Sequence, residues 1–463
     1  MFGYKPKEPF KNFTVITGKN LFNPATTIPG YVISKTTGAL VVSANFSTSD
    51  YIPVKPHTNY VRAGSFQYAF YNSAKTFISG GESGIMLAPA NAAYLRLYVL
   101  TSGLNTFQVE VGEVPTAVEA YQTRYVYNEV PRIIIPHTIY AVVGRETNVY
   151  FDNLIFDDAA KYDWDITCTK GTHQNERWTY TPEVADVGTI AFKIAIYKDG
   201  ILLDTATASI VVIAADAKNS TAISGMIIGD STSAGGAYMG EVRTLVGVDS
   251  IALTQLGTVG TAPNLCEAYS GKDINWFYTH ADSPFTYSGV FNFAQYLTDN
   301  GYTAPDMVFI NMGVNDEFIY LDDASALAKA ATVITQLDAI IANIKVSNAN
   351  VRIGIAVTIP PSKNQDSFGA SYASDQSKWR YKRNNLLWIE QLINYYSAKT
   401  STNIYLVPIN VNLDTVNNMN VETVAVNSRN SATVVRQNNS VHPATIGYYQ
   451  IADSVYNWIK AYA

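Results

Sequence analysis

Three short polar motifs in the C-terminal half of the chain contain residue types suited to nucleophilic acyl chemistry. Ser231 lies in MIIGDSTSAGG, directly after an apolar run, Asn315 lies in FINMGVND, and His442 lies in NNSVHPATIGYY. A serine hydroxyl needs a base, nearly always histidine, and the oxyanion that forms after its attack needs hydrogen-bond donors. Ser231, His442 and Asn315 have the side chains for these three functions.

Each motif also has a purely structural explanation. Gly-Asp-Ser and Gly-x-Asn-Asp are common in tight turns, and His442 before Pro443 is also typical of the start of a helix. The other histidine in this region, His280, lies in a polar loop and is expected at the surface. The placement of the motifs along the chain favours the catalytic interpretation.

Five apolar runs of strand length alternate with helical segments after residue 221. The runs are AISGMIIG, SIALTQLG, PDMVFINMG, VRIGIAVTIP and NIYLVPINV. They predict an α/β domain with a flavodoxin-like, five-stranded parallel sheet that is covered by helices on both faces. Ligands bind such sheets at the carboxyl ends of the strands. Ser231 follows the first run, Asn315 follows the third and His442 precedes the last helix, so we expect them at one edge.

Two helices of this domain are predicted by apolar spacing. One spans 323–346, and the other is the C-terminal stretch TIGYYQIADSVYNWIKAYA. A three-four spacing places one set of apolar residues of the first helix on a single face. The set is Leu327, Ala331, Ile334, Leu337, Ile341 and Ile344.

The motifs GDS, GVND and VHP, in this order and spacing, resemble the SGNH (GDSL-like) hydrolase family over about residues 222–463. The resemblance implies that Ser231 is the nucleophile and lends its backbone N–H to the oxyanion hole. It also implies that Asn315 is the side-chain oxyanion donor and His442 the general base. The family hydrolyses esters, often acetyl groups on polysaccharides, so the resemblance implies an acetyl ester hydrolase without a metal or other cofactor.

Two positions depart from the family's pattern. Asn439 stands where the family has an aspartate three residues before the histidine, and Ala268 in CEAYSGKD stands at the oxyanion-hole glycine, with Gly271 nearby. An asparagine carbonyl can accept the imidazole Nδ1–H, but it brings no charge to stabilise the imidazolium. A backbone carbonyl or Asp414 in NVNLDTVNN could orient the ring instead. An active, a slow and an inactive esterase therefore all remain open.

The first 215 residues have the rhythm of short β-strands with turn residues between them. Hairpins are predicted around Thr36-Thr37-Gly38 and at Asp199-Gly200. The expected organisation is a leader or attachment segment at 1–18, a jelly-roll-like β-sandwich at 19–113, a connector at 114–131, an immunoglobulin-like β-sandwich at 132–215 and the SGNH-like domain at 216–463.

The composition of the chain argues against a nucleic-acid partner, a membrane span, a signal peptide and cysteine-based sites. The 463 residues carry a net charge of −6 without a basic block, so we expect no nucleic-acid partner. The apolar runs are too short to span a bilayer, and the first residues do not resemble a signal peptide. Cys168 and Cys266 are the only cysteines, which predicts neither a disulfide framework nor a CxxC metal site.

The layout of the chain, with the segment KNLFNPATTIPGYVIS…SDYIPVKPHTNY, resembles phage tail and baseplate proteins. This resemblance implies a homo-oligomeric virion protein, released without Sec export, whose partners are other tail proteins and a bacterial surface polysaccharide. Its β-domains would then serve attachment or carbohydrate binding. The alternative is a structural or receptor-binding virion protein whose SGNH-like domain holds glycan without turning it over.

Overall fold

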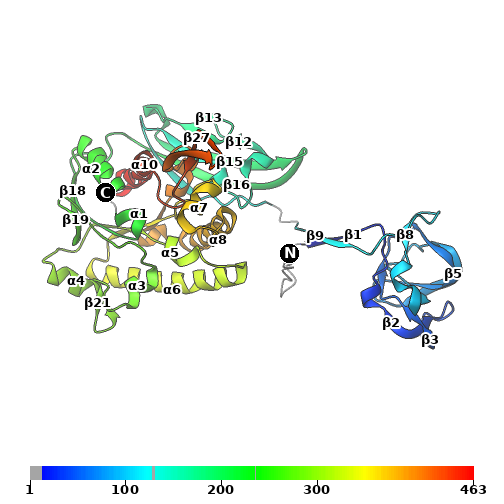
Figure 1. Cartoon of the computed structure of the whole chain (residues 1–463). Coiled ribbons are helices and arrows are strands. Elements are labelled where there is room, and N and C mark those ends of the chain that lie inside the picture. Colours follow the sequence, from blue (N-terminus) through cyan, green and yellow to red (C-terminus); the bar gives the residue numbers. More distant parts are fainter. Residues whose placement is uncertain (1–12, 128–130, 235) are drawn as a thin grey trace. The chain divides into compact units, whose positions relative to one another are not determined.

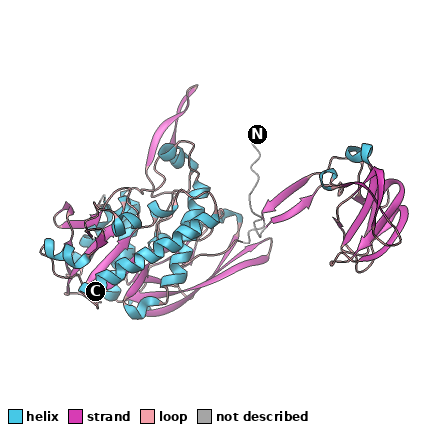
Figure 2. Ribbon diagram, turned by 90° about the horizontal axis from the view of Figure 1, so that it is seen from below, coloured by secondary structure: helices cyan, strands magenta, loops and turns pink. Residues whose placement is uncertain are grey.

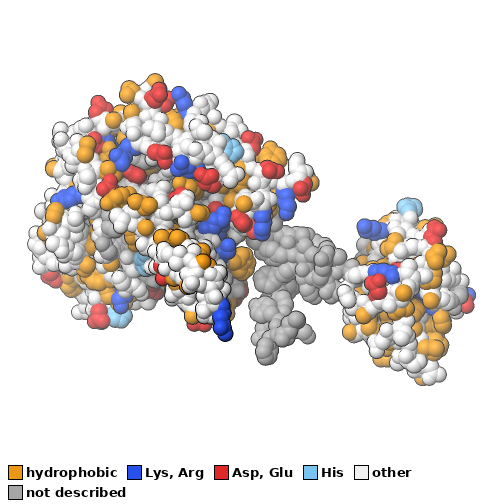
Figure 3. Space-filling view, turned by 45° about the horizontal axis from the view of Figure 1, so that its top comes forward, with side chains coloured by type: hydrophobic (Ala, Val, Ile, Leu, Met, Phe, Trp, Pro, Cys, Tyr) orange, Lys and Arg blue, Asp and Glu red, His pale blue; other side chains and the backbone are white. Residues whose placement is uncertain are grey.

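The structure, a computed structural model, describes residues 13–127, 131–234 and 236–463. The chain divides into two compact units, Met1–Glu129 and Val130–Ala463 (Figure 1). Acidic and basic side chains are interspersed on the face of the molecule that Figure 3 shows. The two units are described separately below.

The N-terminal unit contains a seven-stranded sheet in which all pairings are antiparallel. Its path is β2-β3-β7-β5-β6, while β4 pairs with β7 and β8 with β5. The strands are β2 (Ile28–Ile33), β3 (Leu40–Thr48), β4 (Ile52–Pro53), β5 (Asn59–Tyr71), β6 (Phe77–Leu87), β7 (Tyr94–Leu100) and β8 (Glu110–Val111). The predicted hairpin turn joins β2 to β3, with Gly38 at φ +67°. The jelly-roll arrangement stays a prediction.

Two segments that were expected to be irregular contain strands. β1 (Phe13–Thr17) lies in the predicted leader, and it pairs antiparallel with β9 (Thr123–Tyr127) in the predicted connector. Residues 1–12 and 128–130 of these segments lie outside the described residues. β1 and β9 lie at the two ends of this unit in the sequence, so no local sequence pattern predicts that they pair.

The segment that follows forms two sheets around one core. A four-stranded sheet has the order β10-β16-β15-β12, and a three-stranded sheet has the order β11-β14-β13. The strands are β10 (Thr138–Val142), β11 (Thr147–Tyr150), β12 (Asp163–Thr167), β13 (Thr172–His173), β14 (Arg177–Tyr180), β15 (Gly188–Lys198) and β16 (Ile201–Ile213). Val149 and Trp178 of one sheet pack in the same cluster as Phe192 and Ile210 of the other. The hairpin predicted at 199–200 joins β15 to β16, and both turn residues have positive φ, as a type I′ turn requires.

The site-bearing part of the C-terminal unit is a second seven-stranded sheet. Its path is β19-β20-β17-β23-β24-β25, and β18 pairs with β17. The strands are β17 (Ala222–Gly229), β18 (Ala252–Leu256), β19 (Val259–Thr261), β20 (Asn264–Ala268), β23 (Met307–Asn311), β24 (Arg352–Ala356) and β25 (Ile404–Val407). The five predicted runs are the strands β17, β18, β23, β24 and β25, and each pairs in parallel. The sheet has seven strands rather than five because β19 and β20 extend it beyond β17.

Helices and two small hairpins complete this unit. The helices are α1 (Ser231–Ala234), α2 (Ala237–Val248), α3 (Ile274–Thr279), α4 (Phe293–Asp299), α5 (Val314–Glu317), α6 (Asp323–Ser347), α7 (Gln365–Tyr372), α8 (Lys378–Tyr396), α9 (Ile409–Asn412) and α10 (Thr445–Tyr462). The hairpins are β21 (Thr286–Tyr287) with β22 (Val290–Phe291), and β26 (Val421–Asn427) with β27 (Asn430–Gln437). One cluster packs Ile228 and Val308 of the sheet against α6 and α8, and another packs Ile227 and Phe309 against α2 and α10. Helices therefore cover both faces of the sheet.

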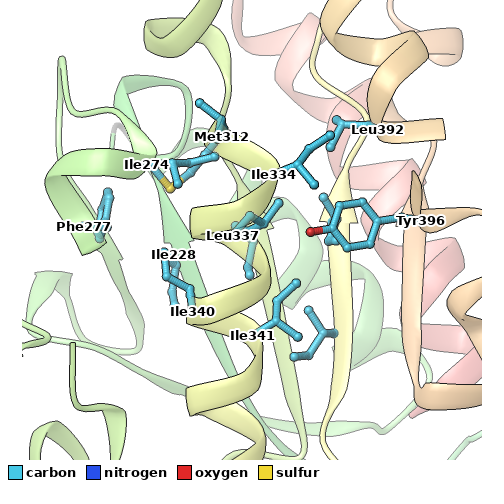
Figure 4. Packing of buried hydrophobic residues seen from close by; sticks show 14 of the residues in the cluster. Ile228, Ile274, Phe277, Met312, Ile334, Leu337, Ile340, Ile341, Leu392 and Tyr396 are labelled. Carbon is cyan, nitrogen blue, oxygen red and sulfur yellow. The ribbon is translucent and has the colours of Figure 1, made fainter. Parts of the chain in front are cut away.

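Helix α6 has the predicted position, but its buried face differs at the N-terminal end. Ile334, Leu337 and Ile341 point toward α8 and the sheet, as predicted (Figure 4). Leu327 and Ala331 are exposed, and the smaller Ala326 and Ala330 are buried in the core cluster instead. By length and composition, α6 is the one described helix that could cross a membrane, but its apolar side chains belong to the core.

The predicted boundary at 215/216 does not separate compact units, because 130–463 is one unit. The Lys460 ammonium is fully buried and donates to Ala215 O and Asn219 Oδ1 at 2.8 and 2.7 Å. Arg132 contacts Glu390 of α8 through two hydrogen bonds of 2.8 and 2.7 Å. The β segment and the α/β segment therefore stabilise each other.

We accordingly expect the fragment 216–463 to be much less stable than the fragment 131–463. The deletion exposes apolar surface of α10 and α8 and leaves buried polar groups without partners, at a cost on the order of 5 kcal/mol. Urea unfolding of both fragments, followed by circular dichroism, measures the difference. Equal unfolding midpoints would show that 216–463 is an independent domain after all.

Candidate active site

Ser231 is placed at the carboxyl end of the central strand β17. Gly229 ends the strand, and a Cβ at this position would collide with Ser233 of α1, so only glycine allows the chain to turn this tightly. Asp230 then caps α1, since its Oδ1 accepts hydrogen bonds from Thr232 N at 2.8 Å and Thr232 Oγ1 at 2.7 Å. Ser231 is the first residue of α1, where a backbone N–H has no acceptor within the helix.

Buried side chains fix α1 against the sheet. The Asn311 amide at the end of β23 donates to Thr232 Oγ1 and Ser233 Oγ, both at 3.0 Å. Ser233 Oγ also lies 2.6 Å from the Tyr238 hydroxyl. Burial raises the pKa of Asp230 to about 6, although its hydrogen bonds to Thr232 oppose this effect. The residues around Ser231 thus form a rigid support for its hydroxyl.

His442 Nε2 lies 2.9 Å from Ser231 Oγ, which is hydrogen-bond distance for a general base and its nucleophile. The two residues are 211 positions apart in the sequence and meet because His442 precedes α10. Burial lowers the pKa of His442 below its ordinary value of 6.5. At neutral pH the imidazole is therefore uncharged and able to accept a proton.

The Asn439 side chain binds the backbone of the loop that carries His442 and does not contact the imidazole ring. Its Oδ1 accepts hydrogen bonds from His442 N at 2.8 Å and from Val441 N at 3.1 Å. The Asn420 amide donates to the carbonyl oxygens of His442 and Pro443 at 3.0 and 3.1 Å. Asn439 thus stabilises the backbone of this loop. The predicted hydrogen bond between the Asn439 side-chain carbonyl and the imidazole is not present.

Asp414, the alternative orienting residue, is engaged elsewhere. Its Oδ1 accepts from Val416 N and Asn417 N, at 2.9 and 2.8 Å, and its Oδ2 accepts from Asn417 Nδ2 at 2.9 Å and from the Tyr150 hydroxyl at 3.4 Å. The prediction that Asp414 orients His442 is therefore wrong, because its own turn uses the carboxylate. Among the residues that the structure describes, none accepts a hydrogen bond from His442 Nδ1.

Asn315 belongs to α5, directly after strand β23. The chain leaves the strand through Gly313 at φ +121°, where a Cβ would collide with the Trp388 indole. One N–H of the Asn315 amide donates to Lys272 O at 3.0 Å. Asn315 therefore lies against the loop that follows β20, and its amide retains a second N–H for a ligand.

Residues 226–455 match the family model of the GDSL-like lipases and acylhydrolases. This part of the chain is a GDSL-like lipase/acylhydrolase domain. The match spans the three motifs, from the strand before Ser231 to the helix after His442. No curated protein sequence matches the chain.

Solved structures similar to the chain cover about half of it. A possible lipase from Chitinophaga pinensis is 14% identical, with a TM-score of 0.32, and covers 52% of this chain and 98% of its own. A carbohydrate esterase of family 3 from Talaromyces cellulolyticus is 12% identical, with a TM-score of 0.31, and covers 51% and 96%. Est24, a carbohydrate acetylesterase from Sinorhizobium meliloti, is 10% identical, with a TM-score of 0.30, and covers 52% and 99%.

The segment after β20 offers two candidates for the second oxyanion amide. Ala268, the predicted residue, is the buried last residue of β20. Gly271 lies three residues further on, in the turn closed by Lys272 N and Tyr269 O at 3.3 Å, and has φ +74°. The assignment of this role to Ala268 stays a prediction.

Two buried carboxyl groups follow Asn315 in α5. Burial raises the pKa of Asp316 to about 7 and that of Glu317 to about 8, and like charges nearby add to both effects. Lys329 Nζ lies 3.6 Å from Asp316 Oδ1. Near neutral pH Glu317 is therefore largely protonated and Asp316 partly so, which reduces the negative charge close to an oxyanion site. Among the described residues, no group of three or more His, Cys, Asp or Glu side chains could hold a metal ion.

Proposed function

We propose that the GDSL-like domain is a serine ester hydrolase in which Ser231 is the nucleophile and His442 the general base. The observation that carries the proposal is the 2.9 Å distance between Ser231 Oγ and Nε2 of a half-buried, uncharged His442. The family match supports ester hydrolysis as the reaction.

The proposed reaction proceeds through an acyl-enzyme. Ser231 Oγ attacks the ester carbonyl carbon while its proton moves to His442 Nε2, which gives a tetrahedral oxyanion. Collapse of this intermediate breaks the C–O bond, and the imidazolium returns the proton to the departing alcohol. Water, deprotonated by His442, then attacks the acyl-serine and releases the carboxylic acid and the free hydroxyl of Ser231.

Three donors are suited to stabilise the oxyanion. They are the N–H of Ser231 at the start of α1, the second N–H of the Asn315 amide, and the backbone N–H of either Ala268 or Gly271. The hydrogen bond from Asn315 to Lys272 O ties the second donor to the turn that follows β20. Preorganised donors of this kind each contribute about 10²–10³ in rate.

The environment of His442 also supports a second candidate, a domain that holds glycan and turns it over slowly or not at all. Among the described residues, no carboxylate accepts a hydrogen bond from Nδ1, so none compensates the positive charge that forms on the ring in this way. The two candidates differ in what an added carboxylate would do.

We expect Asn439→Asp to raise kcat by about 10–10³-fold and to move the pH midpoint of activity upward. One carboxylate oxygen keeps the bonds to the two backbone amides, and the added charge favours the imidazolium. Steady-state rates with an aryl acetate, measured from pH 5 to 9, test this. Asn438→Asp, which adds the same charge one residue away, is the control.

The outcome separates the two candidates. A rise in both kcat and pH midpoint with Asn439→Asp supports a hydrolase whose histidine lacks a charged partner. If the wild type and Asn439→Asp both fail to hydrolyse any ester, the domain is a glycan-holding module. A variant slower than a fast wild type would show that another group already orients His442.

The finer assignment is that the substrate is an acetyl ester on a bacterial surface polysaccharide and that the chain is a homo-oligomeric part of a phage tail or baseplate. The motifs and the layout of the sequence support it. Acetate release from O-acetylated bacterial polysaccharides tests the substrate. Release from aryl acetates alone would contradict the polysaccharide assignment.

A further inference from the structure

Two neighbouring cavities of about 280 and 420 Å³ share Lys363 and Lys378 in their walls. Lys161, Lys382 and Trp379 line the first, and the hairpin residues Val421 and Val435 line the second. We call these two adjacent cavities, with the residues just named, the lysine groove. Its apolar wall is exposed, since Val421 and Val435 are 55% and 62% accessible.

The lysine groove has more positive than negative side chains in its lining. Its four lysines face three aspartates, and the closest pairs are Lys363 with Asp158 at 3.2 Å, Lys382 with Asp152 at 3.0 Å, and Lys161 with Asp157 at 2.7 Å. Lys378 Nζ contacts only a backbone carbonyl, Lys363 O at 3.3 Å, among the described residues. Burial lowers the pKa of Lys382, and the charge of Lys363 adds to this. An anion in the groove would relieve this repulsion.

Two features of α8 add to the attraction for an anionic sugar. Lys378 is the first residue of this 19-residue helix, whose N-terminus carries a partial positive charge. Trp379 follows and is 56% exposed, with Arg383 over its ring at 5.4 Å. An exposed indole next to Lys378, whose ammonium has no carboxylate partner among the described residues, offers an apolar platform for a sugar ring and a charge for its acidic substituent.

The lysine groove borders the loop that carries His442. Its floor follows β24 at the carboxyl edge of the sheet, where Ser362 N donates to Ser440 O at 2.9 Å. Its wall is the projecting hairpin β26–β27, which leads directly into Asn439 and His442 (Figure 2). A polymer lying in the groove would therefore run toward the candidate active site.

We propose that the lysine groove is a subsite for a negatively charged polysaccharide, with Lys378 pairing with a carboxylate or phosphate group and Trp379 contacting a sugar ring. The proposal rests on the proposed function, because it deepens the substrate class of that site. Carboxylate and phosphate share the chemistry that a lysine recognises, and the polymers chosen for the test distinguish them.

The test is binding of ester-free polymers to the full chain, which requires no turnover. Polygalacturonate, a glycerol-phosphate polymer and neutral xylan are compared by affinity electrophoresis and by tryptophan fluorescence. We expect at least one anionic polymer to bind and xylan to bind more weakly. Lys378→Gln and Trp379→Ala should each weaken that binding about tenfold, and added salt should weaken the wild type.

Matched controls carry the same changes elsewhere. Lys193→Gln removes an exposed lysine of β15, and Tyr395→Ala removes an exposed aromatic residue at the other end of α8; both should bind like the wild type. Equal binding of xylan and the anionic polymers, or unchanged binding in Lys378→Gln, would overturn the proposal, as would no binding at all. Hydrolysis of an aryl acetate, measured separately, shows whether the proposed function itself fails.

Discussion

Ser231→Ala is expected to reduce hydrolysis of an aryl acetate by roughly 10³-fold or more. Among the described residues, the Ser231 hydroxyl is the group within hydrogen-bond distance of His442 Nε2, at 2.9 Å. Its oxygen is therefore the atom that can form the acyl bond. The Asn311 and Ser233 contacts that support α1 do not involve the Ser231 side chain, so the variant should fold normally. Initial rates of wild type and variant at equal concentration measure the loss.

Ser431→Ala is the control for this experiment, since it removes a hydroxyl from the exposed strand β27. Its rate should equal that of the wild type. Hydrolysis by Ser231→Ala at the wild-type rate would remove Ser231 as the nucleophile and leave the family match without its central residue.

His442→Ala is expected to cost a similar factor, about 10³-fold or more, and to abolish the pH dependence of the residual rate. Burial lowers the pKa of His442, so the wild-type rate should rise with pH through a midpoint below 6.5 and then level off. Below that midpoint the ring carries a proton and cannot accept another. Rates between pH 4.5 and 9 measure this.

His280→Ala provides the matched control, because His280 is exposed and its Nδ1 lies near Asp282 at the end of α3. It should leave both rate and midpoint unchanged. The same midpoint in His442→Ala as in the wild type would identify a different base. The double variant of Ser231 and His442 should be no slower than Ser231→Ala, because the two residues act as a unit.

The sequence predicts the residues of the site better than their hydrogen bonds. Ser231 and Asn315 follow parallel strands, and the edge they share follows from the alternation of strands and helices. The pairing of His442 with Ser231 could be expected because few histidines are available. These conclusions depend on topology, which apolar periodicity reveals.

The predictions that the structure corrects concern residues whose function depends on the direction in which one side chain or one backbone N–H points. The Asn439 carbonyl can accept either from the ring or from the backbone two and three residues on, and the tight loop favours the backbone. Asp414 likewise caps its own turn. The choice between Ala268 at the end of β20 and Gly271 in the following turn likewise depends on the direction of one backbone N–H, which composition and periodicity do not encode.

Errors in the fold have a similar cause. β1 and β9 lie far apart in sequence and pair only because the N-terminal unit brings them together. On α6, Ala326 is buried and Leu327 is exposed, so the helix is rotated slightly from the predicted face by its packing on the rest of the unit. Long-range pairing and the distance between elements are both properties of the assembled structure.

The most direct test of the central claim is to identify the acylated residue. The wild-type chain is mixed with an activated acetate ester, quenched in acid during turnover, digested and analysed by mass spectrometry. We predict one acetyl group on Ser231, increased in amount when deacylation is slow and absent from Ser231→Ala. Ester turnover with no acetyl group on Ser231, or with the acetyl group on another residue, would contradict the account.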